Sequence, residues 1–248
     1  MSQYIRSVAL DDLSDEESYI AELPAVKCMS AMEELSLDNS VTFLVGENGT
    51  GKSTLLEGIA VGFGFNPEGG TRNFSFATNE THSPLHERLR LIKTFTRPRD
   101  GYFLRAESFY NAASYIDGLD KINAPTPPII DSYGGRSLHE MSHGESFFAL
   151  IMNRFGGNGL YILDEPEAAL SPARQMSLLI RINELVKQNS QFIIATHSPI
   201  LLAYPDALIY ELTENAITRR RYEETETVSV SKAFLTDPNK MIKRLFGE

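Results

Sequence analysis

The sequence predicts an α/β fold in which a largely parallel central sheet is flanked by helices. Three short runs, VTFLV, LYIL and FIIA, are apolar or β-branched along their whole length, which is typical of strands buried on both faces. Each run ends abruptly in polar residues, with GENGTGKS, DEPE and THSP following in turn. Because open α/β sheets bind ligands at the carboxyl ends of their strands, we expect these three polar segments to share one edge of the sheet.

Helices are expected after these strands. The pairs Ser171-Pro172 and Ser198-Pro199 each offer an N-cap followed by proline at the first helical position. Residues 171–188 carry apolar side chains at helical spacing, namely Leu178, Leu179, Ile182, Leu185 and Val186. The sequence therefore predicts a long amphipathic helix over this segment.

The two ends of the chain show different patterns. Residues 1–40 are expected to form short strands joined by acidic turns, which gives an N-terminal antiparallel β portion. The runs ALIYEL and ITRRRYEE flank the turn TENA and predict a hairpin, and a last helix is expected after Asp237-Pro238. Residues 66–100 are polar and loop-rich with one short helix. We expect a single domain over residues 1–248, with a lid and helical subregion at 66–145.

Composition limits the classes of function. The longest apolar run has six residues, 147–152, far short of the eighteen or so that a membrane helix needs, so no membrane insertion is expected. The N-terminus lacks a secretory signal, and the single Cys28 fits a reducing cytoplasm, so a cytoplasmic location is expected. The net charge of -10 opposes general coating of nucleic acid. Residues 86–105 are locally basic, which indicates either a solvated helix face or contact with nucleic acid or an acidic partner.

The strongest motif is GENGTGKS, residues 46–53, which satisfies GxxxxGKS between a predicted strand and a predicted helix. That context predicts a P-loop that binds ATP and Mg²⁺. Lys52 is expected to reach the β- and γ-phosphates, and the Ser53 hydroxyl to bind Mg²⁺. The remaining predicted nucleotide contacts of the loop are Gly46, Asn48, Gly49, Thr50, Gly51 and Thr54. The three glycines let backbone N–H groups turn toward phosphate oxygens at the start of the helix.

Carboxylates follow the second strand, in LYILDEPEAAL. Asp164 is placed to hold the Mg²⁺ shell, and Glu165 to orient or deprotonate the attacking water, because that role needs a carboxylate near the γ-phosphate. Glu167 lies beyond the strand and is expected to be structural. His197, after the third strand, is interpreted either as a satisfied core histidine or as a γ-phosphate sensor. Catalytic roles are therefore assigned to Lys52, Glu165 and His197.

The stretch HEMSHGESFFAL, residues 139–150, has competing interpretations. It contains HExxH, in which His139 and His143 would bind zinc beside Glu140, as in a zinc protease. It also contains a helix start in which Ser142 caps the helix and Glu145 reaches back. Because a helix that begins at Ser142 leaves the two histidines on either side of its start, the capping pattern argues against a fixed zinc geometry.

Five motifs in this order resemble those of an ABC-type ATPase head. GENGTGKS corresponds to Walker A, MSHGE to the signature, YILDEP to Walker B, ALSPARQ to the D-loop and THS to the switch histidine. The match covers about residues 41–198. The stretches YGGRSLHEMSHGES and LDEPEAALSP are also similar to small bacterial stand-alone predicted ATPases of the AAA family, related to SMC, RecF and OLD-type heads.

This resemblance implies an ATP-dependent homodimer. In such heads the signature residues of one subunit, matched here by Ser142 and Gly144, bind the γ-phosphate held on the Walker A loop of the other. Two copies would then close head to tail around two ATP molecules, with the D-loop, including Ser171, crossing the dimer axis. Hydrolysis by Glu165 and sensing by His197 would reopen the pair.

The chain departs from the family pattern at two places. Its only glutamines are Gln3, Gln175, Gln188 and Gln191, so the Q-loop glutamine expected between Walker A and the signature is absent. Glu107, in FLRAESFYN, is the candidate substitute as a metal or water contact. No aromatic residue before Walker A can be assigned to stack on adenine.

The predicted function is an ATP-hydrolysing switch that acts on an unidentified protein or DNA partner, in DNA repair or phage defence by analogy with the family. Only 34 positions separate Glu107 from Met141, so no coiled-coil arm fits. The ATP-binding subunit of an ABC transporter is the main alternative, although the missing glutamine argues against it. A non-hydrolysing nucleotide-binding protein is a third possibility, against which the presence of Glu165 argues.

Overall fold

A six-stranded sheet forms the centre of the computed structural model, which describes residues 3–11, 19–72, 83–105 and 141–247. Its strands follow one another in space in the order β5-β6-β7-β3-β8-β9. Five of them are parallel, and only β9 runs antiparallel, to β8. Their bounds are β3 Val41–Gly46, β5 Asp100–Arg105, β6 Gly159–Asp164, β7 Gln191–Ala195, β8 Leu208–Leu212 and β9 Ile217–Arg220. The largely parallel sheet is confirmed, and the three apolar runs are its neighbouring strands β6, β7 and β3.

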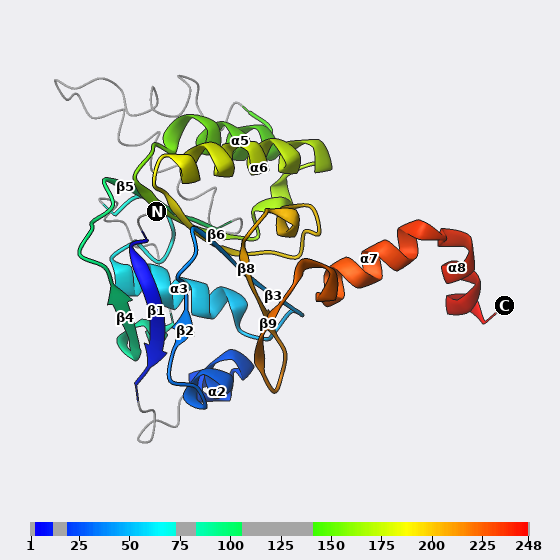
Figure 1. Ribbon diagram of the computed structural model, residues 1–248, viewed down its shortest axis with the longest axis horizontal. Helices are drawn as coiled ribbons and strands as arrows, with labels where there is room; N and C mark the ends of the chain where they lie inside the picture. The colour runs from blue at the N-terminus through cyan, green and yellow to red at the C-terminus, as the bar shows by residue number, and fades with distance from the viewer. Residues whose placement is uncertain (1–2, 12–18, 73–82, 106–140, 248) are drawn as a thin grey trace.

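Helices cover both faces of this sheet (Figure 1). Helices α5, His143–Arg154, and α6, Pro172–Lys187, pack on one face and share a buried apolar cluster with it. Helix α3, Lys52–Phe63, lies on the opposite face, where Leu55, Leu56, Ile59 and Ala60 are fully buried. The sheet therefore separates the predicted signature helix from the helix that follows the Walker A loop.

A small antiparallel sheet, ordered β2-β1-β4, packs beside α3. It consists of β1 Ile5–Leu10, β2 Leu35–Ser36 and β4 Leu89–Lys93. The buried Gln191 joins it to the start of β7, because the amide of this one side chain bonds the backbone of Tyr4, Ile5 and Leu37 at 2.7–3.0 Å. The predicted antiparallel β portion is thus present. Two short helices, α1 Tyr19–Glu22 and α2 Pro24–Ser30, were not anticipated between its strands.

The region expected to be a loop-rich lid contributes to both sheets. Among the described residues of this region, the short helix is the 3-10 helix η1, Pro84–Glu87, capped by Ser83. Strand β4 belongs to the small sheet and β5 to the central sheet, so the basic segment 86–105 lies mostly on strands. The expectation of a solvated helix face was wrong there, because burial of Leu89 and of residues 101–104 favours the extended conformation.

The C-terminal part agrees with the sequence in outline. The hairpin around TENA pairs Leu212 with Ile217, and α6 begins at the N-cap Ser171 as expected. Helix α8, Pro238–Phe246, is present, and the Asp237 side chain caps it by accepting from the Lys240 N–H. The helix expected after Ser198-Pro199 is only the 3-10 turn η5, Leu201–Ala203.

Three further elements lie in the described ranges: the 3-10 helices η4, Pro166–Ala169, and η6, Tyr222–Glu224, and the unanticipated helix α7, Glu226–Thr236. Helices α7 and α8 extend away from the body toward the C-terminus (Figure 1). Among the helices in the described ranges, none is both long and apolar enough to span a bilayer.

Candidate active site

The loop between β3 and α3 has a backbone that only glycine adopts without strain at its turning points. Gly46, Gly49 and Gly51 have φ angles of 140°, 85° and 91°. A Cβ atom on Gly46 would lie 2.1 Å from the Leu212 carbonyl oxygen, because β3 and β8 pair at this position. Gly51 is the N-cap of α3, so the loop turns directly into a helix N-terminus. This geometry is the anion-binding arrangement predicted for a P-loop.

Lys52 is buried at the first position of α3. Its Nζ donates to the carbonyl oxygens of Gly46 at 2.7 Å and Glu47 at 2.8 Å. Burial lowers the pKa of Lys52, while the nearby carboxylates, with Glu165 and Asp164 the strongest, act in the opposite direction. Two backbone carbonyl groups of the loop therefore hold the Lys52 ammonium against it. Around it, Thr50 is buried and donates to Glu47 O at 2.9 Å, Thr54 is half-buried, and Asn48 is exposed.

Ser53 and Asp164 meet where α3 approaches the end of β6. The Ser53 hydroxyl donates to Asp164 Oδ1 at 3.0 Å, and the Asp164 side chain is buried. The two predicted Mg²⁺-binding residues are thus brought together, although 111 positions separate them in the chain. Their oxygens are the donor type that Mg²⁺ prefers.

Arg105 ends β5 directly opposite Asp164 in the register of the sheet. Its Nε lies 3.9 Å from Asp164 Oδ2, and its Nη1 pairs with the Glu57 carboxylate of α3. Sequence reasoning counted Arg105 only as part of a basic segment and placed Glu107 at the site instead. The signal that could have found it is its place at the end of a strand next to the Walker B strand. Glu107 lies outside the described residues.

Glu165 and His197 face each other across the ends of β6 and β7. Glu165 Oε1 lies 3.7 Å from His197 Nε2, and both side chains are partly exposed. Glu165 adopts a left-handed conformation, with φ 48°, and its N–H donates to Ala195 O at 2.9 Å. A non-glycine residue in this conformation is uncommon and often occurs at functional sites. The local backbone thereby directs the carboxylate toward the histidine.

Two polar residues fix the switch loop to the segment after Walker B. The Glu167 carboxylate accepts the backbone N–H of His197, which fits the expectation that Glu167 is structural. Gln175, buried on α6, donates from Nε2 to Leu170 O at 3.0 Å, and its Oε1 accepts from the Ser198 hydroxyl at 2.6 Å. Sequence reasoning noted Gln175 only in its count of glutamines, so this link was missed.

The signature residues lie at the start of α5. Ser142 is its N-cap, and Glu145 Oε2 accepts both the Ser142 N–H at 3.1 Å and its hydroxyl at 2.6 Å, so the predicted helix start is confirmed. Gly144 packs closely on η4, since a Cβ there would lie 2.5 Å from Ala169 O. Within the described residues, the contacts of Ser142 and Gly144 are to α5 and its neighbours, and the structure does not bring them to the Walker A loop of the same chain.

The zinc-protease interpretation falls largely outside the described residues, because His139 and Glu140 are not among them. His143 is the first residue of α5, so the helix does not extend back through Met141. Within residues 3–11, 19–72, 83–105 and 141–247, no group of three His, Cys, Asp or Glu residues could hold a metal ion.

The sheet, the glycine loop with Lys52 and the acidic end of β6 define a P-loop ATPase of the ABC type. Residues 71–203 match the family described as "AAA domain, putative AbiEii toxin, Type IV TA system", and the chain belongs to that family. Residues 26–115 match a second family model, described as "AAA domain".

Two similar proteins and one solved structure agree with this assignment. An uncharacterised ABC transporter ATP-binding protein of Haemophilus influenzae is 27% identical over 183 residues, which cover 67% of each chain. A probable branched-chain amino acid transport ATP-binding protein of Archaeoglobus fulgidus is 26% identical over 211 residues, covering 75% of this chain and 79% of that protein. The solved ATP-binding cassette of an ABC transporter is 19% identical, with a TM-score of 0.50 and coverage of 96% and 97%. This last similarity shows the fold.

Proposed function

We propose that this chain hydrolyses ATP with Mg²⁺ and that hydrolysis drives the closing and opening of a head-to-tail homodimer. The observation that carries the proposal is the convergence of three motifs at one edge of the sheet. Lys52 folds over the glycine loop, Ser53 bonds Asp164, and Glu165 faces His197. These groups come from β3–α3, β6 and β7, so the fold itself assembles them.

Each residue has a role in this proposal. Lys52 binds the phosphates, since two carbonyl oxygens of the glycine loop hold its ammonium at that loop. Ser53 and Asp164 would hold Mg²⁺, which would offset the negative charge of the phosphates. Glu165 orients and deprotonates water, and its partial exposure leaves it accessible to that water. His197, fixed by Glu167 and Ser198, senses the γ-phosphate.

The dimer is supported by where the signature lies. Ser142 is exposed at the start of α5, on the sheet face opposite α3, and its contacts are with its own helix. An exposed helix N-terminus offers N–H groups to an anion. A phosphate on the Walker A loop of a second copy would occupy this position, and because each copy offers its signature to the loop of the other, the two-fold contact closes as a pair with two identical sites.

Glu165→Gln tests hydrolysis. We expect this variant to bind ATP with Mg²⁺, to release phosphate roughly 10³-fold more slowly than the wild type, and to accumulate as a dimer. Phosphate release and light scattering after size exclusion measure the two effects. A Glu165→Gln variant that turns over at the wild-type rate would remove Glu165 from the chemistry, and one that binds ATP as a monomer would contradict dimer closure.

Mixing two inactive variants tests the head-to-tail arrangement. Lys52→Ala removes one half of each site and Ser142→Arg the other half, so each variant alone is expected to be inactive. A mixed dimer retains one site with wild-type Lys52 and wild-type Ser142, and equal mixing should restore roughly a quarter of the wild-type rate. No recovery on mixing would exclude sites shared between two copies. Glu145→Ala, which removes the partner of Ser142 within α5 and a 3.9 Å contact with Arg174, is the control for helix damage.

The ABC transporter subunit is the second candidate, and the names of the two relatives favour it. The structure adds one observation against it: Gln175 and Gln191 are both buried and occupied in structural contacts, so neither replaces the missing Q-loop glutamine. ATP-trapped Glu165→Gln used as bait, with and without nuclease, separates the candidates. Recovery of a membrane subunit supports transport, and nuclease-sensitive recovery supports a role on DNA.

A further inference from the structure

Helices α7 and α8 form a C-terminal arm that carries unburied apolar side chains. The arm extends from the body of the molecule (Figure 1). Val228 is its one buried side chain among the described residues, at the root, and α8 has none. Six of the eleven large apolar side chains that are exposed in the described ranges lie on it, namely Val230, Phe234, Leu235, Ile242, Leu245 and Phe246. Clustering of this kind indicates an interaction surface.

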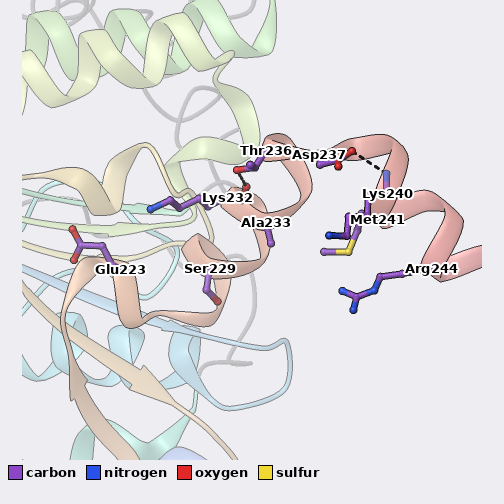
Figure 2. Close-up of a pocket in the computed structure, with 9 residues that line it drawn as sticks. All are labelled: Glu223, Ser229, Lys232, Ala233, Thr236, Asp237, Lys240, Met241 and Arg244. Carbon is purple, nitrogen blue, oxygen red and sulfur yellow. Dashed lines mark hydrogen bonds between the residues drawn. The ribbon is translucent and has the colours of Figure 1, made fainter.

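A hollow of about 610 Å³ lies between the two helices, and Figure 2 shows the residues that line it. Lys232 comes from α7, and Lys240 and Arg244 come from one face of α8. Among the described residues, none of these three side chains makes an ion pair. Two carboxylates also line the hollow, but Asp237 caps α8, and Glu223 lies at the end away from Arg244 (Figure 2). The α8 side of the hollow is therefore cationic.

The apolar side chains of α8 lie on another face of the helix. Lys240 and Arg244 are four residues apart and share one face, whereas Ile242, Leu245 and Phe246 share a different one at the same helical spacing. A flat bilayer surface cannot engage a concave cationic hollow and an apolar face directed elsewhere at the same time. A polypeptide segment can enter the hollow and also wrap the edge of α8.

The root of the arm is bonded to the switch loop and to the sheet. The Tyr222 hydroxyl donates to Pro199 O at 3.1 Å, two residues after His197. The Glu226 N–H donates to Glu211 Oε1 at 2.8 Å, on the strand next to β3. Thr225, between these contacts, is fully buried. The root of the arm is therefore joined to the switch loop through the Tyr222 hydroxyl and, separately, to β8 through Glu226.

We propose that the arm binds an acidic segment of a partner polypeptide, with carboxylates in the hollow and apolar side chains against α8, and that binding acts on the switch loop through Tyr222. Charge complementarity identifies the partner, because α8 carries three cations and no acid in a chain of net charge -10. The second half of this proposal rests on the proposed ATPase function, whereas the first half does not.

Docking is tested on nucleotide-free protein with a fluorescein-labelled helical peptide of alternating Glu and Leu pairs. We expect the fluorescence anisotropy to report binding in the micromolar range, and Lys240→Glu/Arg244→Glu to weaken it by at least tenfold. The same peptide with Lys in place of Glu should bind Lys240→Glu/Arg244→Glu more tightly than it binds the wild type. The affinity of Lys240→Gln/Arg244→Gln for the acidic peptide should lie between those of the wild type and the charge-reversed variant. This neutral variant controls for unfolding of α8 caused by charge reversal. Lys187→Glu/Arg219→Glu, on exposed sites outside the arm, is the matched control.

Three results would overturn docking. They are equal binding of the peptide to the wild type and the charge-reversed variant, an equal loss of peptide binding in the control variant, or binding of phosphatidylglycerol vesicles through α8 without binding of the peptide.

Coupling between the arm and the ATPase site has its own test. In the wild type the peptide should change the rate of phosphate release, and Tyr222→Phe should bind the peptide equally and lose that change. An unchanged wild-type rate would refute coupling. If the wild type hydrolyses no ATP in any condition, the proposed function fails, and the anisotropy still decides docking.

Discussion

The two edges of the central sheet use similar residues in different ways. At the carboxyl edge, Glu165 lies 3.7 Å from His197, and Arg105 lies 3.9 Å from Asp164. At the amino edge, Asp100 accepts hydrogen bonds from Arg154 at 2.9 Å, Gly156 N at 2.9 Å and Tyr161 at 2.8 Å. At the carboxyl edge the partly exposed Glu165 has one long contact, with His197, whereas at the amino edge Asp100 is held by three hydrogen bonds.

This difference separates residues kept for chemistry from residues kept for stability. A buried carboxylate that is fully hydrogen-bonded stabilises the fold, and removing its partners leaves donors without acceptors. The carboxylates of Asp164, Glu165 and Glu167, by contrast, lie around the buried ammonium of Lys52 and favour its charged form, which the binding of phosphate requires. Substitution of an aspartate at the carboxyl edge should therefore lower kcat, and substitution of an aspartate at the amino edge should lower the free energy of unfolding.

Asp164→Asn should have the largest effect on turnover. Loss of one carboxylate charge from the Mg²⁺ site is expected to lower kcat at least roughly 10³-fold, because the metal offsets the charge of the reacting phosphates. The free energy of unfolding should fall only slightly, since the amide oxygen of asparagine can still accept the Ser53 hydroxyl and the contact with Arg105 is a long one, at 3.9 Å. Phosphate release and urea unfolding measure the two quantities. A variant that loses stability and activity in parallel would show that Asp164 is a structural residue.

Asp100→Asn should show the reverse. An amide keeps one acceptor but cannot satisfy the donors of Arg154, Gly156 and Tyr161 together, so the free energy of unfolding should fall by about 2–3 kcal/mol. The kcat of the remaining folded protein should be unchanged, because Asp100 lies at the opposite edge from the Walker A loop. Urea unfolding and phosphate release, normalised to folded protein, provide the test. A large fall in kcat at unchanged stability would contradict the assignment of this edge to stability.

Much of this arrangement could be predicted from the sequence. The runs before GENGTGKS, DEPE and THSP are apolar throughout, and full burial of parallel strands is what that pattern requires. Ser53 and Asp164 were placed together by motif alone, because the carboxyl ends of parallel strands meet at one edge. The capping of α5 by Ser142 and Glu145 followed from local spacing, and local interactions are the kind that a sequence displays directly.

The remainder depends on contacts between distant segments. Gln191 is one polar residue at a strand start, and nothing local shows that its amide meets Ile5 and Leu37. Helix α7 was missed because its apolar residues are mostly unburied, so the pattern of one apolar face is weak. Arg105 was read as part of a charged run, because its role depends on which strand becomes the neighbour of β5. Strand order is a tertiary property.

Gln175→Met tests whether the carboxyl edge also has residues that act through position. This substitution keeps the volume and removes both hydrogen bonds, to Leu170 O and from Ser198. We expect kcat to fall about tenfold with little change in KM, since His197 would lose its fixed position while the phosphate loop is intact. Ser198→Ala should have a similar effect, and the double variant should be less than additive. A fall in melting temperature alone, at wild-type kcat, would mean that Gln175 only stabilises the fold.

The smallest expected effect is the dependence of the Asp100 contribution on pH. Burial alone raises the pKa of Asp100, but the N–H of Gly156, the charge of Arg154 and the Tyr161 hydroxyl more than offset it, so the pKa lies below its ordinary value of 3.8. A carboxyl group with a lowered folded-state pKa stabilises the protein above its unfolded pKa, and that stability is lost as the pH falls through the folded pKa. The difference in unfolding free energy between wild type and Asp100→Asn should thus be constant from pH 5 to 7 and narrow below about pH 4. Urea unfolding at closely spaced pH values measures it. A difference that stays constant well below pH 4, or that narrows already near neutral pH, would show that the Asp100 carboxylate does not supply this stability.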